Sequence, residues 1–225
     1  MSRRRLAALA LAVAVPLAAP PLAAQGRPLT ASLAVGAAEH RVDAGDGVEQ
    51  STGAYLSGEL RRAVLPWLEL RLRAAGGALS ARSDGAADRT LSEAELVAAT
   101  TPLPWLTVTA GARSRRYASD LGDQRWLGAT LGAESRVALL GDAVQGLVHL
   151  AVMPAATVTD HPRPSVALGA GAGVEVRRDR LSAAVVYAFE RYDFAPTLRL
   201  RDGVTVRRLE QLATLGVRAS VRLGK

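Results

Sequence analysis

Apolar side chains recur at every second position from Leu29 to the C-terminal end of the chain. Between residues 68 and 74, leucine and alanine alternate with Glu69, Arg71 and Arg73. A helix with 3.6 residues per turn would mix these two sets on every face, whereas an extended strand sends them to opposite sides. The period therefore predicts an all-β chain in which each strand has one apolar face and one polar face.

Turn residues divide this pattern into ten candidate strands. Tight connections alternate with longer, polar connections rich in Asp, Gly or Pro, so the short and long connections fall on opposite rims. Long alternating strands joined in this way predict a single antiparallel up-and-down β-barrel, with eight strands as the alternative count. It is a transmembrane β-barrel if its apolar face contacts lipid. The ten ranges are 29–41, 51–64, 67–81, 90–100, 105–118, 125–139, 143–157, 165–177, 181–193 and 206–223.

The N-terminal segment has the pattern of a secretory signal peptide. Residues 1–5 are basic, residues 6–15 form an unbroken apolar run, and small residues precede a cleavage point after Ala24. Prolines at positions 16, 20 and 21 interrupt the segment before it reaches the ~20 apolar residues that a membrane-spanning helix needs. We therefore expect residues 1–24 to be removed on export and residues 25–225 to form one barrel domain.

The charge and cysteine content exclude several classes of function. The formal net charge is +7, but Lys225 is the only lysine, and the arginines alternate with apolar residues instead of forming runs. This distribution argues against a nucleic-acid partner. The absence of cysteine excludes a disulfide framework, a thiolate zinc site and a cysteine nucleophile. We expect no metal and no cofactor.

The alternation leaves open whether the apolar face contacts a protein core or lipid. The export signal, the even strand count, strands at or above the ~9–11 residues of a tilted span, and the asymmetric rims favour lipid. The apolar face is Leu, Val and Ala, although a protein core of this size normally contains more aromatic side chains. A soluble periplasmic ligand-binding barrel with a solvated charged face is the alternative.

Charged side chains of both signs share the second face of the strands. In a barrel with an apolar exterior this face lines the lumen, where the charges pair across neighbouring strands. Gly169, Gly171 and Gly173 fall on the same face and leave room for long arginine side chains or for strand coiling, with a narrow water path as the alternative. The predicted lumen charges are Glu59, Arg61, Glu69, Arg71, Arg73, Glu93, Glu95, Arg113, Arg115, Glu134, Arg136, Glu175, Arg177, Glu190, Glu210, Arg218 and Arg222.

Six aromatic residues lie near the predicted strand ends. Aromatic side chains at both ends are typical of the interfacial girdles of a membrane barrel. We therefore expect these six side chains at the membrane–water interfaces. They are Trp67 and Trp105 beside tight connections, where both fall in the turn region, and Tyr117, Trp126, Tyr192 and Phe194 beside long ones.

The signal peptide, the alternation, the tight turns and the polar loops together resemble the small outer-membrane β-barrel proteins of Gram-negative bacteria. The resemblance covers residues 27–225 and is one of architecture. It implies an outer-membrane location, outer-membrane lipid and the assembly machinery as partners, and periplasmic termini. Such proteins usually end in an aromatic residue that the assembly machinery reads, whereas this chain ends in Leu223, Gly224 and Lys225. We expect a monomer.

At the level of function, these patterns favour a structural or surface-loop interaction role, with slow passage of small solutes through an Arg/Glu-lined lumen, and no enzyme activity. The alternative is a rim enzyme that acts on lipid or peptide, similar to the omptin proteases or the lipid A-modifying enzymes. Asp160 and His161 in the fourth long connection are the best candidates, with His161 as the base and Asp160 as the carboxylate that orients it. Acidic loop residues are more typical of solvated turns.

Overall fold

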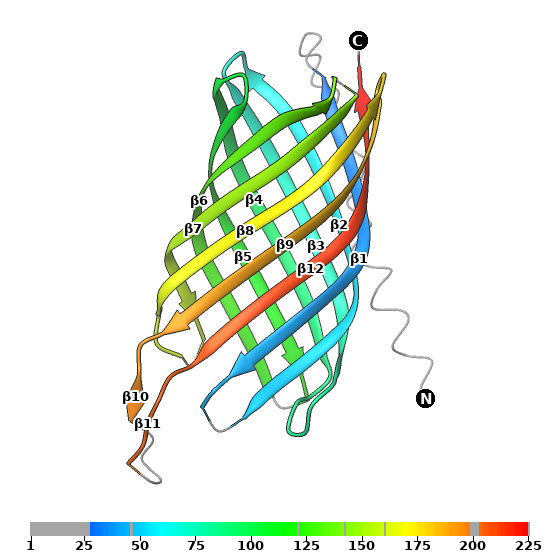
Figure 1. The fold of residues 1–225 in the computed structure, drawn as a ribbon. Coiled ribbons are helices and arrows are strands. Elements are labelled where there is room, and N and C mark those ends of the chain that lie inside the picture. Colours follow the sequence, from blue (N-terminus) through cyan, green and yellow to red (C-terminus); the bar gives the residue numbers. More distant parts are fainter. Residues whose placement is uncertain are drawn as a thin grey trace, which may run out of the picture.

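The computed structural model describes residues 28–45, 47–120, 122–141, 143–159, 161–198 and 203–224. Ten long strands form a closed, up-and-down antiparallel barrel, and a short two-stranded hairpin extends from one rim (Figure 1). This confirms the predicted fold class and the count of ten. Within the described residues, no helix is long and apolar enough to cross a membrane. The predicted signal peptide lies outside the described residues.

The strands follow the predicted ranges closely, and most are a few residues longer. The exception is the last connection, where the sequence predicts a strand from residue 206, but the chain first forms a separate hairpin and the barrel strand begins at Leu209. The strands are β1 (Leu29–Asp43), β2 (Val48–Leu65), β3 (Leu68–Ala81), β4 (Arg89–Leu103), β5 (Leu106–Ser119), β6 (Gly122–Leu140), β7 (Val144–Val158), β8 (Pro164–Arg178), β9 (Leu181–Phe194), β10 (Thr197–Leu198), β11 (Thr205–Val206) and β12 (Leu209–Leu223).

Pairing between the first and last strands closes the barrel. β1 and β12 pair over their whole length, from Leu29 opposite Leu223 to Asp43 opposite Leu209. Every other barrel strand pairs with the strands before and after it in the barrel order. A closed sheet has no edge with unpaired N–H and C=O groups, and in hydrocarbon each such group would cost several kcal/mol. The pairing is therefore of the kind that a membrane-spanning sheet requires.

The two rims differ in the length of their connections. At the short-turn rim, tight turns join β2 to β3, β4 to β5, β6 to β7 and β8 to β9, and β1 begins and β12 ends there. Asp179 in the last of these turns has a φ of 53°, a left-handed conformation that Asp tolerates better than most residues. The other connections, including the β10–β11 hairpin, form the long-loop rim. The predicted asymmetry of the rims is confirmed.

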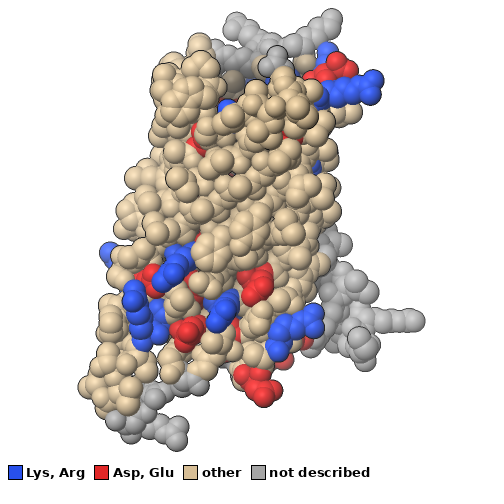
Figure 2. Space-filling model, in the orientation of Figure 1, with Lys and Arg blue, Asp and Glu red and all other residues tan. Residues whose placement is uncertain are grey.

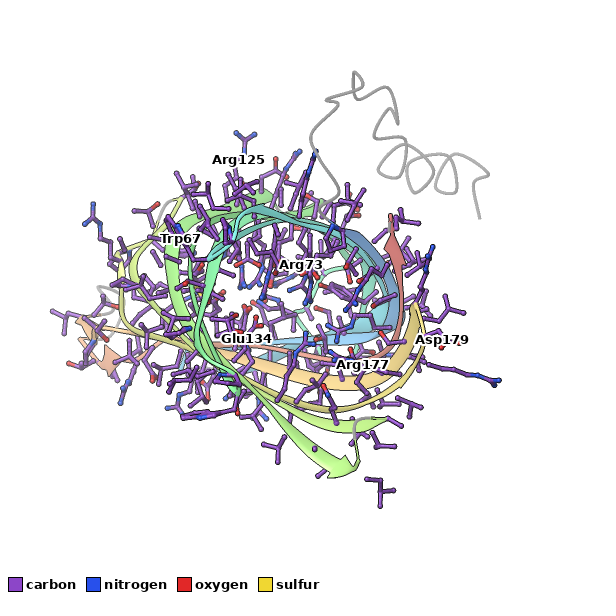
Figure 3. All side chains as sticks on the ribbon, turned by 90° about the horizontal axis from the view of Figure 1, so that it is seen from above. Trp67, Arg73, Arg125, Glu134, Arg177 and Asp179 are labelled. Carbon is purple, nitrogen blue, oxygen red and sulfur yellow. The ribbon has the colours of Figure 1, made fainter. Side chains whose placement is uncertain are left out.

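The inner and outer faces of the wall separate as the alternation predicts. On β4, Glu93 and Glu95 are buried inside the barrel, while Leu96 is among the exposed hydrophobic residues outside it. The space-filling view shows a broad zone of uncharged residues on the outer surface, with the charged side chains gathered toward the long-loop rim and at the opposite end (Figure 2). Seen along the barrel, Arg73 and Glu134 point into the lumen, whereas Arg125 points away from it (Figure 3).

One part of the wall near the long-loop rim lacks hydrogen bonds between neighbouring strands. Among the described residues, pairing of β7 with β8 ends at Val152 opposite Leu168, although β7 continues along β6 to Val158 and β8 begins along β9 at Pro164. Pro154 has no N–H to donate and lies in the unpaired part of β7. An isolated bridge between Val158 and His161 lies at the rim end of this unpaired part.

Candidate functional site

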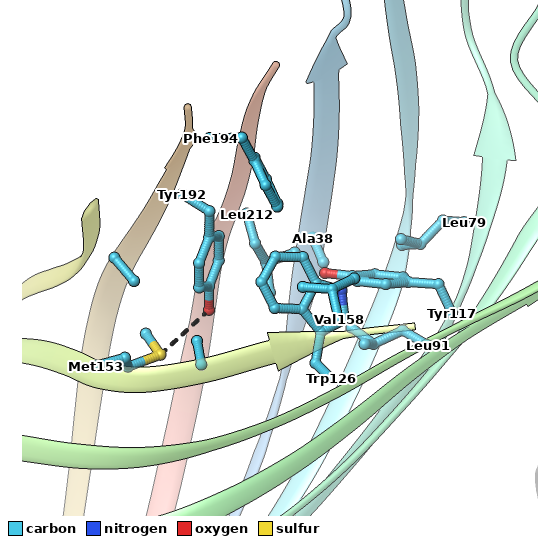
Figure 4. Packing of buried hydrophobic residues seen from close by; sticks show 12 residues of the cluster. Ala38, Leu79, Leu91, Tyr117, Trp126, Met153, Val158, Tyr192, Phe194 and Leu212 are labelled. Atoms are coloured by element: carbon cyan, nitrogen blue, oxygen red, sulfur yellow. Dashed lines mark hydrogen bonds between the residues drawn. The ribbon is translucent and has the colours of Figure 1, made fainter. Parts of the chain in front are cut away.

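An apolar cluster fills the lumen next to the long-loop rim, and we call it the aromatic plug. Phe194 is only 1% exposed, and the rings of Trp126 and Tyr192 lie 4.5 Å apart between centroids (Figure 4). The hydroxyl of Tyr192 points at the sulfur of Met153 from 3.5 Å. The plug consists of Ala38, Leu79, Leu91, Tyr117, Trp126, Met153, Ala156, Val158, Ala167, Tyr192, Phe194 and Leu212. The plug draws its side chains from both sides of the β7–β8 break.

The prediction of interfacial positions for Tyr117, Trp126, Tyr192 and Phe194 is wrong. All four side chains are buried inside the barrel. Each occupies an inward position of its strand, where the ring fills the lumen next to the long-loop rim. Arginines border these rings, since Arg115 donates a hydrogen bond of 3.1 Å to the Tyr192 hydroxyl and the Arg208 guanidinium lies 5.7 Å from the centroid of the Phe194 ring. The face on which each residue lies was already visible in the alternation, because Trp126 alternates with outward Leu127. Trp67 and Trp105 are 63% and 55% exposed, in tight turns as predicted.

A set of polar side chains around the buried carboxylate of Glu210 lies between the aromatic plug and the long-loop rim. The ring of His40 stacks on Tyr117 with centroids 4.2 Å apart, and its Nε2 atom lies 3.6 Å from a carboxylate oxygen of Glu210. Gln124 donates a hydrogen bond of 2.8 Å to Glu210, and Arg208 pairs with the same carboxylate. Glu210 is a predicted lumen charge, whereas Gln124 and Arg208 are not among the predicted site residues. These contacts brace the plug from the rim side.

A balanced network of ion pairs crosses the middle of the lumen, and we call it the central network. Arg115 on β5 lies 2.5 Å from Glu93 on β4 and 2.6 Å from Glu190 on β9. Arg113 pairs with Glu190 and, at 3.0 Å, with Glu95. β5 and β9 are not neighbours in the sheet, so these pairs tie opposite walls together. Arg73 completes three arginines against three glutamates.

Further ion pairs lie between the central network and the short-turn rim. Arg71 on β3 reaches Glu69 on its own strand and Glu134 on β6, both at 2.6 Å. Arg61 pairs with Glu59. Glu175 on β8 receives three arginines, from β6, β8 and β12. Of the seventeen predicted lumen charges, the structure places all but Arg222 in ion pairs on the inner face, and Arg222 is exposed at the short-turn rim.

The three glycines of β8 lie on the inner face and permit close approach of strand backbones. A Cβ atom on Gly173 would lie 2.5 Å from the carbonyl oxygen of Val185 on β9. This distance is too short for a contact between a Cβ atom and an oxygen atom, so the position requires glycine unless the backbone shifts. A Cβ atom on Gly171 would lie 3.1 Å from the carbonyl oxygen of Tyr187. The structure thus assigns Gly171 and Gly173 a role in strand packing, while Gly169 has only ordinary contacts.

A cavity of about 260 Å³ lies in the lumen between the plug and the short-turn rim. Seven arginine and five glutamate side chains line it, together with His149, several serines and threonines, and small residues of β8. The arginines are Arg61, Arg71, Arg73, Arg113, Arg115, Arg136 and Arg218. Arginine is the side chain best suited to hold carboxylate and phosphate groups, because its planar guanidinium can donate two parallel hydrogen bonds.

The rim residues singled out for chemistry are only partly described. Asp160 lies outside the described residues, and the ring of His161 packs edge-on against Phe194 with centroids 6.4 Å apart. Among the described residues, no group of three or more His, Asp or Glu side chains is arranged to hold a metal ion. The acid–base pair at the rim stays a prediction.

A closed antiparallel barrel with an apolar exterior and an ion-paired lumen has the fold of an outer-membrane β-barrel. No protein-family model matches the sequence. No curated protein matches it either. The fold class therefore rests on the architecture of the barrel and not on a sequence match.

Several solved structures are similar in overall barrel architecture. Neisserial surface protein A (NspA) is 13% identical over 86% of this chain and 97% of its own, with a TM-score of 0.40. The translocator domain of the autotransporter NalP from Neisseria meningitidis is 12% identical over 98% of this chain and 94% of its own, also with a TM-score of 0.40. Ail of Yersinia pestis is 12% identical over 86% of this chain and 98% of its own, with a TM-score of 0.33.

Proposed function

We propose that this protein is an outer-membrane barrel that anchors surface loops and whose lumen is closed toward the cell exterior. The observation that carries the proposal is the aromatic plug, whose Leu79, Leu91 and Phe194 side chains are each 1% exposed. In this arrangement the long-loop rim faces outward and the short-turn rim faces the periplasm. Passage of solutes is slow and limited to small molecules, and the protein is not an enzyme.

The contacts below the plug support a restricted lumen. The Arg113–Glu190 and Arg71–Glu134 pairs connect strands that are not neighbours in the sheet. An aqueous path along the barrel axis would have to part these pairs as well as the plug rings. The side chains of the aromatic plug and of the ion pairs would need to move together. The free-energy cost of this movement disfavours free diffusion of solutes through the lumen.

The outer face supports lipid as the surrounding medium. Leu33, Leu96, Leu150 and Leu215 each expose about half or more of their surface, and they belong to a belt that runs around several strands. Soluble proteins rarely expose apolar patches of that extent. This disfavours the soluble periplasmic barrel. We propose a monomer in contact with outer-membrane lipid and inserted by the outer-membrane assembly machinery. The rim-enzyme alternative rests only on the sequence pattern at Asp160 and His161.

Single-channel recording in planar bilayers tests the closed lumen. We expect the wild-type protein to show no long-lived open level. The double variant Trp126→Ala, Phe194→Ala should show brief conductance steps that the wild-type protein lacks, because it removes two rings that pack 6.0 Å apart in the plug and leaves only the ion pairs below it to restrict the lumen.

The matched control is Tyr187→Ala, which truncates an aromatic side chain on the outer face of β9 and should remain silent. Insertion of each variant is checked by the heat-dependent shift of the folded barrel on a gel. Large, regular conductance steps from the wild-type protein would contradict the proposal.

A further inference from the structure

Three arginines converge on a single buried carboxylate near the short-turn rim, and we call this group the Glu175 cluster. The Glu175 side chain is 4% exposed. Arg218 on β12 donates a hydrogen bond of 3.2 Å to it, Arg136 on β6 lies 3.9 Å away, and Arg177 pairs with it from its own strand. Three positive charges thus share one negative charge. The cluster has a local excess of two positive charges.

The carboxylates on neighbouring strands are held by other arginines. Glu59 pairs with Arg61, and Glu134 pairs with Arg71 at 2.6 Å. The central network is balanced, with three arginines and three glutamates. The nearest negative groups therefore have their own partners, and among the described residues Glu175 is the carboxylate that pairs with Arg136, Arg177 and Arg218.

The Glu175 cluster also contains a buried donor without an acceptor. The Nε atom of Arg218 is inaccessible to solvent and has no hydrogen-bond partner. Buried donors in folded proteins are nearly always satisfied by protein, water or ligand. Arg218 and Arg136 both line the lumen cavity of about 260 Å³, with Arg61 beside them. The unsatisfied donor therefore belongs to a side chain that borders a space where a small molecule can bind.

Access to this space comes from the short-turn rim. The side chain of Arg136, which lines the cavity, is 35% exposed, whereas Arg115 of the central network is 3% exposed. Arg177 does not line the cavity, but it pairs with Glu175 beside Arg136 and is 33% exposed. The aromatic plug closes the lumen on the other side of the cavity, and the barrel wall separates the cavity from lipid. A ligand in this position would come from the aqueous phase at the short-turn rim.

We propose that Arg136, Arg177 and Arg218 bind the phosphate group of a small soluble molecule, either inorganic phosphate or a phosphate monoester. A phosphate monoester carries a charge of about −1.5 to −2 near neutral pH and offers three terminal oxygens, and inorganic phosphate carries a charge between about −1 and −2. This charge matches the excess of the Glu175 cluster. The guanidinium groups bind the oxygens through the donors that Glu175 does not occupy. The site does not depend on the plug being closed.

Isothermal titration calorimetry on the folded full-length barrel in neutral detergent tests the site, with inorganic phosphate as the probe at low ionic strength. We expect one phosphate per barrel. Arg136→Gln and Arg218→Gln should each weaken binding by about tenfold, the loss expected from one charge-assisted hydrogen bond. Arg177→Gln provides a third variant near the rim, in case a deeper substitution prevents folding.

The control variant is Arg125→Gln, which removes an arginine that is 68% exposed outside the barrel and should leave binding unchanged. Glu175→Gln should tighten binding, because it removes the carboxylate that competes for the same guanidinium groups. Acetate in place of phosphate should bind more weakly, because it carries a single charge. A dissociation constant for phosphate above about 10 mM would overturn the proposal. A loss of affinity in the Arg125→Gln variant equal to that in the Arg136→Gln and Arg218→Gln variants would also overturn it.

Discussion

Leu215→Arg is expected to lower the free energy of unfolding in lipid vesicles by about 2–4 kcal/mol, measured by urea titration of the inserted barrel. Leu215 lies in the middle of β12 on the outer face and is 55% exposed. In register it lies opposite Ala37 on β1 and Tyr187 on β9, so it is surrounded by uncharged residues. A guanidinium at this depth would have to leave water and enter hydrocarbon.

The control for this experiment is the same substitution at the end of the same strand. Leu223 also faces outward but lies at the short-turn rim, where an arginine can reach the aqueous interface. Leu223→Arg should cost roughly 0–1 kcal/mol. If both variants inserted equally well, or if the Leu215→Arg protein remained monodisperse in buffer without detergent, the outer face of the barrel would not contact hydrocarbon.

Glu190→Gln is expected to destabilise the barrel by about 3 kcal/mol, the cost of leaving a buried cation without its partner. The Glu190 carboxylate accepts hydrogen bonds from Arg113 and, at 2.7 Å, from the Tyr192 hydroxyl, and it pairs with Arg115 at 2.6 Å. Removal of its charge leaves three arginines against two glutamates in the central network. The measurement is the midpoint of urea unfolding in vesicles.

A second substitution separates charge balance from packing. In the double variant Glu190→Gln, Arg113→Met, two arginines face two glutamates, so a part of the lost stability should return. Arg113→Met alone should destabilise the barrel, since Glu190 and Glu95 then lose a partner at the same position. Strictly additive losses in the double variant would show that the central network does not act through charge pairing.

The alternation of side chains, together with the turn residues, predicts the all-β class, ten strands, two unequal rims and the inward position of the predicted lumen charges other than Arg222. Glu95 and Leu96, for example, are adjacent in sequence and lie on opposite sides of the wall. This property is local, because successive residues of any strand point in opposite directions. The placement of Trp126 and Phe194 shows where composition was misleading. Their inward positions follow from the same alternation, which here overrides the general tendency of aromatic residues near strand ends to lie at the membrane interface.

The contacts across the lumen could not be predicted in the same way. Arg136, Glu175 and Arg218 come from β6, β8 and β12, and the aromatic plug combines residues from Ala38 to Leu212. Their meeting depends on the register of every strand pair and on the shift that accumulates around the closed barrel. The sequence by itself therefore determined which side chains enter the lumen, because that depends only on neighbouring residues. The tertiary structure decided which of them meet, because a partner across the lumen is set by closure of the whole sheet.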